Sequence, residues 1–292
     1  MRLTILGTGA MACLYGARLG SQTDVTLAGS WAEGVTAIRE HGIIIEESAG
    51  PAVMQVNAAR LGAESIAPAD LVLVLVKAWQ TELVAEHLPG LLAPDGIALT
   101  LQNGLGNLEQ LGPRAHLGVT TQGATLLGPG RVRPGGAGLT HIAAPEWVVA
   151  AFQRAGFEAH RAEAAEVDGL LWGKLVVNCG INALTALLRV PNGELLRRPD
   201  AKELMERAAL ECAQVGRAKG IALPFADPAA RVREVAERTA INKSSMLQDI
   251  LRGARTEIDA INGAVARAGA RVGVSTPVNE TLARLVRALG AA

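Results

Sequence analysis

The chain begins with the stretch that decides its fold, Arg2-Leu3-Thr4-Ile5-Leu6-Gly7-Thr8-Gly9-Ala10-Met11-Ala12. Its first residues have the apolar character of a short buried strand, and a helical pattern begins near Ala10. Between them, Gly7-x-Gly9-x-x-Ala12 is the dinucleotide-binding fingerprint. Its first glycine permits a tight turn, its second lets a pyrophosphate approach the backbone, and its third position needs only a small residue.

A glycine-rich turn also connects ordinary strands and helices, so the context of the fingerprint matters. Here it follows an expected strand and opens an expected helix, which favours a nicotinamide or flavin site. The amides at the helix N-terminus would face the phosphate oxygens. The expected cofactor-binding residues are Gly7, Thr8, Gly9, Ala10, Met11 and Ala12.

The second expected strand, residues 25–28, ends at Gly29-Ser30, the position that commonly selects between NAD and NADP. NAD enzymes usually carry Asp or Glu there to accept hydrogen bonds from the ribose hydroxyls. This chain has no acid at that end, so nothing repels a 2′-phosphate, but it has no Arg there either. The Ser30 hydroxyl and nearby backbone amides are the evident donors, and we expect NADP as the cofactor.

The two halves of the chain differ in pattern. The first alternates strands and helices, with a small hairpin expected at 42–46 and 53–57, a buried parallel strand at 71–77 and a turn region at 128–138. From about Val167 strand signals vanish and helical patterns run to the end. The sequence therefore predicts an α/β protein, an N-terminal Rossmann-type doubly wound sheet followed by an all-helical C-terminal domain. We expect a dinucleotide-binding domain at residues 1–165 and a helical substrate and catalytic domain at residues 166–292.

Composition favours a cytoplasmic enzyme. The 292 residues are 49% hydrophobic, which permits a substantial core and suggests two domains. Equal numbers of basic and acidic residues (28 each) and 3% aromatic residues leave no basic field or stacking platform for nucleic acid. The three cysteines are widely separated, which is typical of free thiols in a reducing compartment. The sequence shows no signal peptide and no metal-ligand spacing, and its apolar run at 71–76 is too short to span a membrane.

A polar stripe interrupts an apolar helical segment of the second half. Lys174, Asn178 and Asn182 are four residues apart, so on a helix each is rotated about 40° from the last and all three face one way. Their neighbours are mostly apolar and require a core. An ammonium and two carboxamides on such a helix need polar partners or a polar ligand, which favours a binding cleft beside the cofactor. The alternative is a stripe that faces solvent.

Two strand ends in the first half point to the same place, because ligands of open parallel sheets bind beyond the carboxyl ends of the strands. Lys77 ends the strand at 71–77, and Asn103 follows a strand expected at 97–101. Lys77 could instead be a solvated surface residue, and Asn103-Gly104 could simply make a turn.

A further cluster lies at residues 242–259. Ser245 and Asp249 share one helix face, and Glu257 is expected about two turns further on, displaced to a neighbouring side. A carboxylate there could meet the Lys174 stripe. The alternative is a solvated Glu257 paired with Arg252 or Arg255.

Together these motifs resemble the ketopantoate reductase (2-dehydropantoate 2-reductase) family, and they occur in that family's order from residue 7 to about residue 262. The matching segments are Gly7–Ala12, Lys77-Ala78-Trp79-Gln80, Gln102-Asn103-Gly104, Lys174-x-x-x-Asn178-x-x-x-Asn182, Asn192, Ser244-Ser245-Met246-Leu247-Gln248-Asp249 and Thr256-Glu257-Ile258. The family reduces 2-dehydropantoate to pantoate with NADPH, on the route to pantothenate and coenzyme A. Its fold is a Rossmann domain followed by a helical domain.

The resemblance implies roles for single residues. Lys174 matches the general acid, and Glu257 matches the acidic residue near substrate and nicotinamide. The implied substrate contacts are Lys174, Asn178, Asn182, Asn192, Ser245 and Asn103, and the further implied cofactor contacts are Lys77, Asn103, Ala124 and Glu257. Ser30 departs from the family pattern, which commonly has an arginine there. The implied partner is a small 2-keto acid, and the implied assembly is a monomer or homodimer.

The chemistry of ketone reduction suits these residue types. Hydride arriving at the carbon leaves developing alkoxide charge on the oxygen, and a lysine that is protonated at neutral pH can donate the proton. Three other functions remain open from the residues: an oxidoreductase for another 2-keto or β-hydroxy acid, a non-catalytic NADP-sensing module, and a partner-binding helical domain on an inert Rossmann scaffold.

Overall fold

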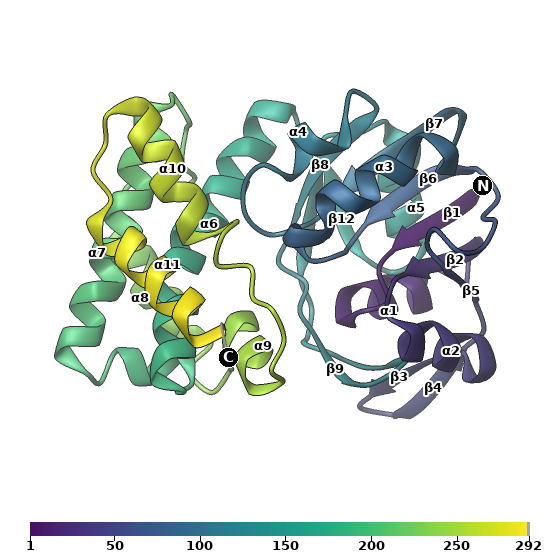
Figure 1. Ribbon diagram of the computed structural model, residues 1–292, viewed down its shortest axis with the longest axis horizontal. Coiled ribbons are helices and arrows are strands. Elements are labelled where there is room, and N and C mark those ends of the chain that lie inside the picture. Colours follow the sequence, from purple (N-terminus) through teal and green to yellow (C-terminus); the bar gives the residue numbers. More distant parts are fainter. Residues whose placement is uncertain (291–292) are drawn as a thin grey trace. The chain divides into compact units, whose positions relative to one another are not determined.

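The structure is a computed structural model that describes residues 1–290. It divides into two compact units, the first formed by residues 1–102 and 107–167 and the second by residues 103–106 and 168–290 (Figure 1). The first unit is built on a mostly parallel sheet and the second is helical. The predicted fold class is therefore confirmed.

The first unit is organised around an eight-stranded sheet. Its order is β12-β11-β8-β7-β6-β1-β2-β5, parallel from β5 to β8, with β11 antiparallel to β8. Because the chain proceeds outward from β1 in one direction and from β6 in the other, the topological switch point lies between these two strands, where dinucleotides bind in such sheets. The strands are β1 (Arg2–Leu6), β2 (Asp24–Gly29), β5 (Asn57–Arg60), β6 (Ala69–Val74), β7 (Leu92–Thr100), β8 (Ala115–Thr120), β11 (Leu139–Ile142) and β12 (Glu158–Arg161).

Helices cover both faces of this sheet. The side chains of strand β1 point to both faces: Leu3 and Ile5 belong to the buried cluster on one face, and Leu6 belongs to the cluster on the other. The first cluster includes residues of α1 (Ala10–Leu19), α2 (Ala32–His41) and α5 (Glu146–Arg154), and the second includes residues of α3 (Thr81–Leu91) and α4 (Asn107–Leu111). Burial on both faces accounts for the continuous apolar runs of the central strands.

A second, four-stranded sheet of the first unit has the order β4-β3-β10-β9. Strands β3 (Ile43–Glu47) and β4 (Gly50–Met54) form the predicted hairpin, and β9 (Ala124–Gly128) and β10 (Arg131–Pro134) complete the sheet. The prediction of a turn region at 128–138 was wrong for residues 131–134, which form β10, while residues 129 and 130 do form a turn. Only Val132 of that strand is buried, so its pairing with β3 and β9 forms the strand without an apolar pattern of its own.

The second unit is helical in its described part. Its core is formed mainly by the buried face of the 25-residue helix α6 and by residues of α7, α8 and α11. Helix α6 is long and apolar enough to cross a membrane, but 67% of its most apolar window is buried, as in the core helix of a globular protein. The helices are α6 (Ala164–Leu188), η2 (Asn192–Leu195), α7 (Pro199–Ala218), α8 (Pro228–Arg238), α9 (Ser245–Leu251), α10 (Asn262–Val272) and α11 (Pro277–Gly290).

Candidate functional site

The turn between β1 and α1 has the geometry that the fingerprint requires. Gly7 has a φ of +125°, and its amide donates to the Ala28 carbonyl at 2.7 Å. A Cβ at Gly7 would lie 3.2 Å from the Leu75 backbone, so this position needs glycine both for its backbone angle and for close approach. Ala12 is fully buried against the sheet.

Gly9 is the N-cap of α1, and no side chain caps the helix there. A Cβ at Gly9 would have no atom within 4 Å, so the space above it is open. Uncapped amides at a helix N-terminus beside open space fit an anionic pyrophosphate. The residues of this turn therefore fit a dinucleotide cofactor.

Other predicted cofactor residues lie at the same end of the main sheet. Ser30 follows β2, and its hydroxyl accepts a hydrogen bond from Gln80 Nε2 at 3.3 Å. Lys77 directly precedes the 3₁₀ helix η1 (Ala78–Gln80) at the carboxyl end of β6. Strands β2, β1 and β6 are neighbours, so their carboxyl ends adjoin. Ala124 starts β9, which packs against α1.

The strand before Lys77 is shorter than predicted, since β6 ends at Val74. The Leu75 amide still donates to the Leu6 carbonyl at 2.9 Å, and beyond it the buried Gln102 side chain donates to the Val76 carbonyl at 2.9 Å and to the Thr81 hydroxyl at 2.9 Å. Gln102 thus fixes the connection that carries Lys77.

In the second unit, the polar stripe lies on one continuous helix, α6. Lys174 and Asn178 are partly buried and Asn182 is buried, so none of the three is exposed. Burial lowers the pKa of Lys174 to about 8, while the Glu257 carboxylate acts in the opposite direction and favours the charged form. Lys174 is therefore an ammonium group that can release its proton near neutral pH.

Glu257 is 6% exposed and accepts a hydrogen bond from Asn103 Nδ2 at 3.3 Å. Residues 103–106 pack with the second unit, which also contains Glu257, and this packing brings Asn103 to the Glu257 carboxylate. The Leu105 amide donates to the Ala260 carbonyl at 3.0 Å. Gly104 has a φ of +83°, and a Cβ there would lie 2.3 Å from the Ala260 oxygen. The close approach of the turn at residues 103–106 to Ala260 therefore helps to hold Asn103 beside Glu257.

The predicted placement of Glu257 on the helix of Ser245 was wrong. Helix α9 ends at Leu251, and Gly253 with a φ of +64° follows. Arg252, one of the two proposed ion-pair partners of Glu257, instead lies 3.0 Å from the buried Asp249 carboxylate. Glu257 meets Lys174 from an irregular segment, not from a helix face.

Asn192 and Ser245 lie on separate elements. Asn192, in η2, is buried and donates from Nδ2 to the Thr239 hydroxyl at 2.8 Å, while its Oδ1 is buried without a hydrogen-bond partner in the described chain. Ser245 is the exposed first residue of α9. The preceding Ser244 caps α9, and its hydroxyl lies 2.7 Å from that of Thr185 on α6.

The Thr185–Ser244 contact was missed from the sequence. The capping signal was present, because a serine preceded the helical pattern, but the pattern gave no indication that the cap would be anchored to α6. This hydrogen bond ties the start of α9 to the helix that carries Lys174.

Two family profiles match most of the chain. The profile described as ketopantoate reductase PanE/ApbA matches residues 3–147, and that described as ketopantoate reductase PanE/ApbA C terminal matches residues 166–290. The chain belongs to the ketopantoate reductase family. The resemblance proposed from the sequence motifs is confirmed.

Curated relatives agree with this ketopantoate reductase assignment. A 2-dehydropantoate 2-reductase of Halobacterium salinarum is 38% identical over 301 residues, with 98% of each chain covered. The enzyme of the same name from Archaeoglobus fulgidus is 42% identical over 231 residues, covering 75% of this chain and 76% of the relative.

Solved structures share the fold over nearly the whole chain. The PanE/ApbA family ketopantoate reductase from Ralstonia eutropha superposes with a TM-score of 0.90 at 34% identity, covering 99% of this chain and 98% of the other. A D-mandelate dehydrogenase in complex with NADH and anilino(oxo)acetate has a TM-score of 0.92 at 29% identity, with the same coverage. A nicotinamide cofactor fits this fold, and Ser30 remains the departure from the expected ketopantoate reductase pattern.

Proposed function

We propose that this chain reduces 2-dehydropantoate to (R)-pantoate with NADPH, with Lys174 as general acid, as a cytoplasmic step toward pantothenate and coenzyme A. The observation that carries the proposal is the Lys174–Glu257 pair, an ammonium with a pKa lowered to about 8 beside a buried carboxylate. Family membership and the names of the relatives support the substrate. The three buried free thiols, Cys13, Cys179 and Cys212, agree with a reducing compartment.

The glycine turn at residues 7–12 would hold NADPH, which when bound would supply a hydride to the keto carbon of the substrate. The carbonyl oxygen gains negative charge as the hydride arrives, and the Nζ of Lys174 donates a proton to it. The products are an alcohol, NADP⁺ and a neutral Lys174, which recovers its proton from water. Glu257 favours the protonated lysine between turnovers, and the Asn103 amide holds one oxygen of that carboxylate.

The remaining polar residues suit a small hydroxylated keto acid. Carboxamide groups of Asn178 and Asn182 can donate to the substrate carboxylate from the helix face that carries Lys174. The resemblance assigns substrate contacts to Asn192 and Ser245 as well, and the exposed Ser245 hydroxyl can donate or accept.

The proposal is tested by following NADPH absorbance with purified protein and a panel of keto acids. The expected result is a kcat/KM for 2-dehydropantoate well above those for pyruvate, 2-ketoisovalerate and 2-oxo-2-phenylacetate. Equal or greater activity with one of the other three acids would reject the proposed substrate. Absence of turnover with all four would favour a nucleotide-sensing function.

A second candidate is the NADH-dependent reduction of a different 2-keto acid. Two observations favour it: Ser30 replaces the arginine expected beside a 2′-phosphate, and the D-mandelate dehydrogenase complex with NADH has closely similar coordinates. The same panel separates the candidates when it is run with both cofactors, since this alternative requires faster turnover of 2-oxo-2-phenylacetate or another keto acid with NADH.

A further inference from the structure

Arg60 places a positive charge next to the end of β2. It is the last residue of β5, which pairs in parallel with β2, and its register partner is Gly29, immediately before Ser30. The Leu61 amide also donates to the Gly29 carbonyl at 3.1 Å, so the two strand ends stay together. In this type of sheet the adenosine ribose of the cofactor lies at the end of β2.

The register also fixes the face on which Arg60 emerges. Paired residues of parallel strands point to the same face, and a Cβ at Gly29 would lie 3.0 Å from the side chain of Thr8. Two residues earlier, the paired Leu27 and Ala58 pack into the core that includes α1. Arg60 therefore leaves the sheet on the face of the glycine turn.

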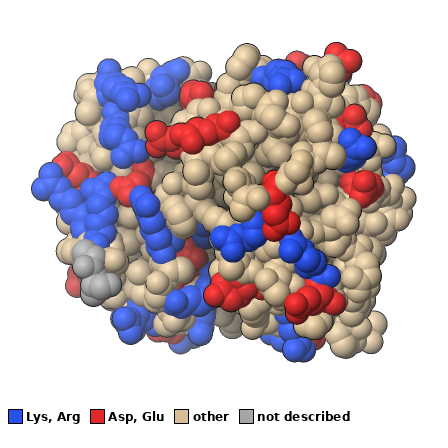
Figure 2. All heavy atoms as spheres, turned by 45° about the vertical axis from the view of Figure 1, so that its right-hand side comes forward, with Lys and Arg blue, Asp and Glu red and all other residues tan. Residues whose placement is uncertain are grey.

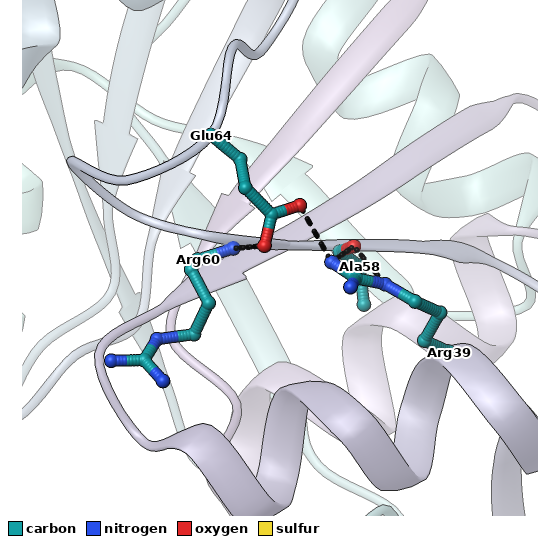
Figure 3. A network of polar contacts seen from close by, with 4 residues as sticks. All are labelled: Arg39, Ala58, Arg60 and Glu64. Carbon is teal, nitrogen blue, oxygen red and sulfur yellow. Dashed lines mark hydrogen bonds and ion pairs between the residues drawn. The ribbon is translucent and has the colours of Figure 1, made fainter.

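The Glu64 carboxylate takes its hydrogen bonds from other groups, and the Arg60 guanidinium acts on it through its charge. Glu64 accepts the backbone amide of Arg60 at 3.3 Å and the guanidinium of Arg39 at 2.7 Å, and Arg39 also donates to the Ala58 carbonyl at 2.8 Å. Figure 3 shows the Arg60 side chain directed away from this network. Its Nε is buried and has no hydrogen-bond partner in residues 1–290. A buried donor of this kind calls for an acceptor that the protein itself does not supply.

We infer that Arg60 binds the 2′-phosphate of NADPH and sets the preference for NADPH over NADH, in the role that an arginine at position 30 would otherwise fill. A planar guanidinium with five donors suits a phosphate group. Ser30, whose hydroxyl already accepts from Gln80, adds its own donor proton. The inference rests on one part of the proposed function, that the cofactor is NADPH, and does not depend on which keto acid is the substrate.

The test measures nucleotide binding by titration calorimetry without a keto acid, so it does not depend on the substrate. Arg60→Gln is expected to weaken binding of NADPH and of adenosine 2′,5′-bisphosphate by at least about tenfold, the value of one charged hydrogen bond. Binding of NADH and of 5′-AMP, which lack the 2′-phosphate, is expected to change by less than about twofold. Arg60→Lys is expected to retain part of the preference for NADPH over NADH, because it keeps the positive charge but loses the paired donors of the guanidinium.

Arg39→Gln is the matched control, because it removes one arginine charge from the same network but leaves the Arg60 guanidinium in place. It is expected to leave the ratio of NADPH to NADH affinity unchanged. Loss of the preference in Arg39→Gln but not in Arg60→Gln would overturn the assignment, as would a wild-type protein that binds NADH more tightly than NADPH. Failure of 2-dehydropantoate turnover would leave these affinities interpretable and would count only against the proposed substrate.

Discussion

Lys174 differs from an ordinary surface lysine in that burial lowers its pKa to about 8 while Glu257 opposes the shift. If it is the proton donor, Lys174→Ala should lower kcat by at least about 100-fold, the low end for a positioned general acid. Affinity for NADPH should persist, because the glycine turn lies in the other unit. Steady-state kinetics and calorimetric titration measure the two quantities. Lys219→Ala, an equal charge change at an exposed lysine, is the control, and near-normal turnover of Lys174→Ala would exclude the role.

The same pKa predicts a pH dependence. Lys174 must be protonated to donate, so kcat/KM should fall as pH rises through about 8, by about tenfold per pH unit above it. In Glu257→Gln the charge that raises the pKa of Lys174 is absent, so the alkaline limb should move to lower pH. pH–rate profiles of both proteins measure this. An alkaline limb at the same pH in both would show that the titrating group is not Lys174 beside Glu257.

At the scale of elements, the segment 103–106 is held against Ala260 by a contact that only glycine permits. In Gly104→Ala the new Cβ would meet the Ala260 oxygen at 2.3 Å, so Asn103 should be displaced from Glu257 and kcat should fall. The overpacking should also cost about 1–3 kcal/mol of unfolding free energy beyond the strain of a positive φ.

Gly112→Ala supplies the control, because Gly112 has the same φ of +83° with no atom within 4 Å of a Cβ. Urea denaturation and steady-state kinetics of the two variants separate backbone strain from the clash. Equal losses of stability and activity would mean that the close approach to Ala260 does not position Asn103.

Prediction from sequence succeeded for elements whose side chains carry the pattern. The apolar strands β1 and β6 and the stripe on α6 were recognisable because their own residues alternate or repeat with the period of the structure. Prediction failed where pairing between strands decides the structure. Strand β10 has a single buried residue and is formed by its hydrogen bonds with β3 and β9. Helix α9 was extended too far because the positive φ of Gly253 has no periodic signal.

The candidate site shows the same limit. Lys174, Asn178 and Asn182 could be grouped from their spacing on one helix, whereas the hydrogen bond from Asn103 to Glu257 joins residues 154 positions apart. The position of Arg60 likewise depends on the pairing of β5 with β2, and this arginine has no motif of its own. Their roles in binding and catalysis remain predictions.

At the scale of the whole molecule, charge is balanced in number. The chain has 28 basic and 28 acidic residues, and on the face drawn in Figure 2 the two kinds are interspersed. Such a surface gives little long-range attraction for an anionic cofactor or keto acid. On the proposed function, we therefore expect affinity for the phosphates to come from local groups, namely the amides of the glycine turn and the side chains at the ends of β2, β5 and β6.

This view yields a prediction for the stability of the whole chain. NADPH at about 100 times its Kd should add about 2.7 kcal/mol to the unfolding free energy of the wild type. Gly9→Ala should fold as well as the wild type, because no atom lies within 4 Å of the new Cβ, but the methyl group occupies the space that a pyrophosphate needs. If the Kd rises about tenfold, the same NADPH concentration should stabilise the variant by only about 1.4 kcal/mol.

Chemical denaturation with and without NADPH measures both values. Gly90→Ala is the control, since Gly90 also has an open Cβ position but lies in α3, away from the turn. It should show the full stabilisation by NADPH. A Gly9→Ala protein stabilised as strongly as Gly90→Ala would mean that the cofactor does not approach the backbone at Gly9, and the dinucleotide site would then have to lie elsewhere.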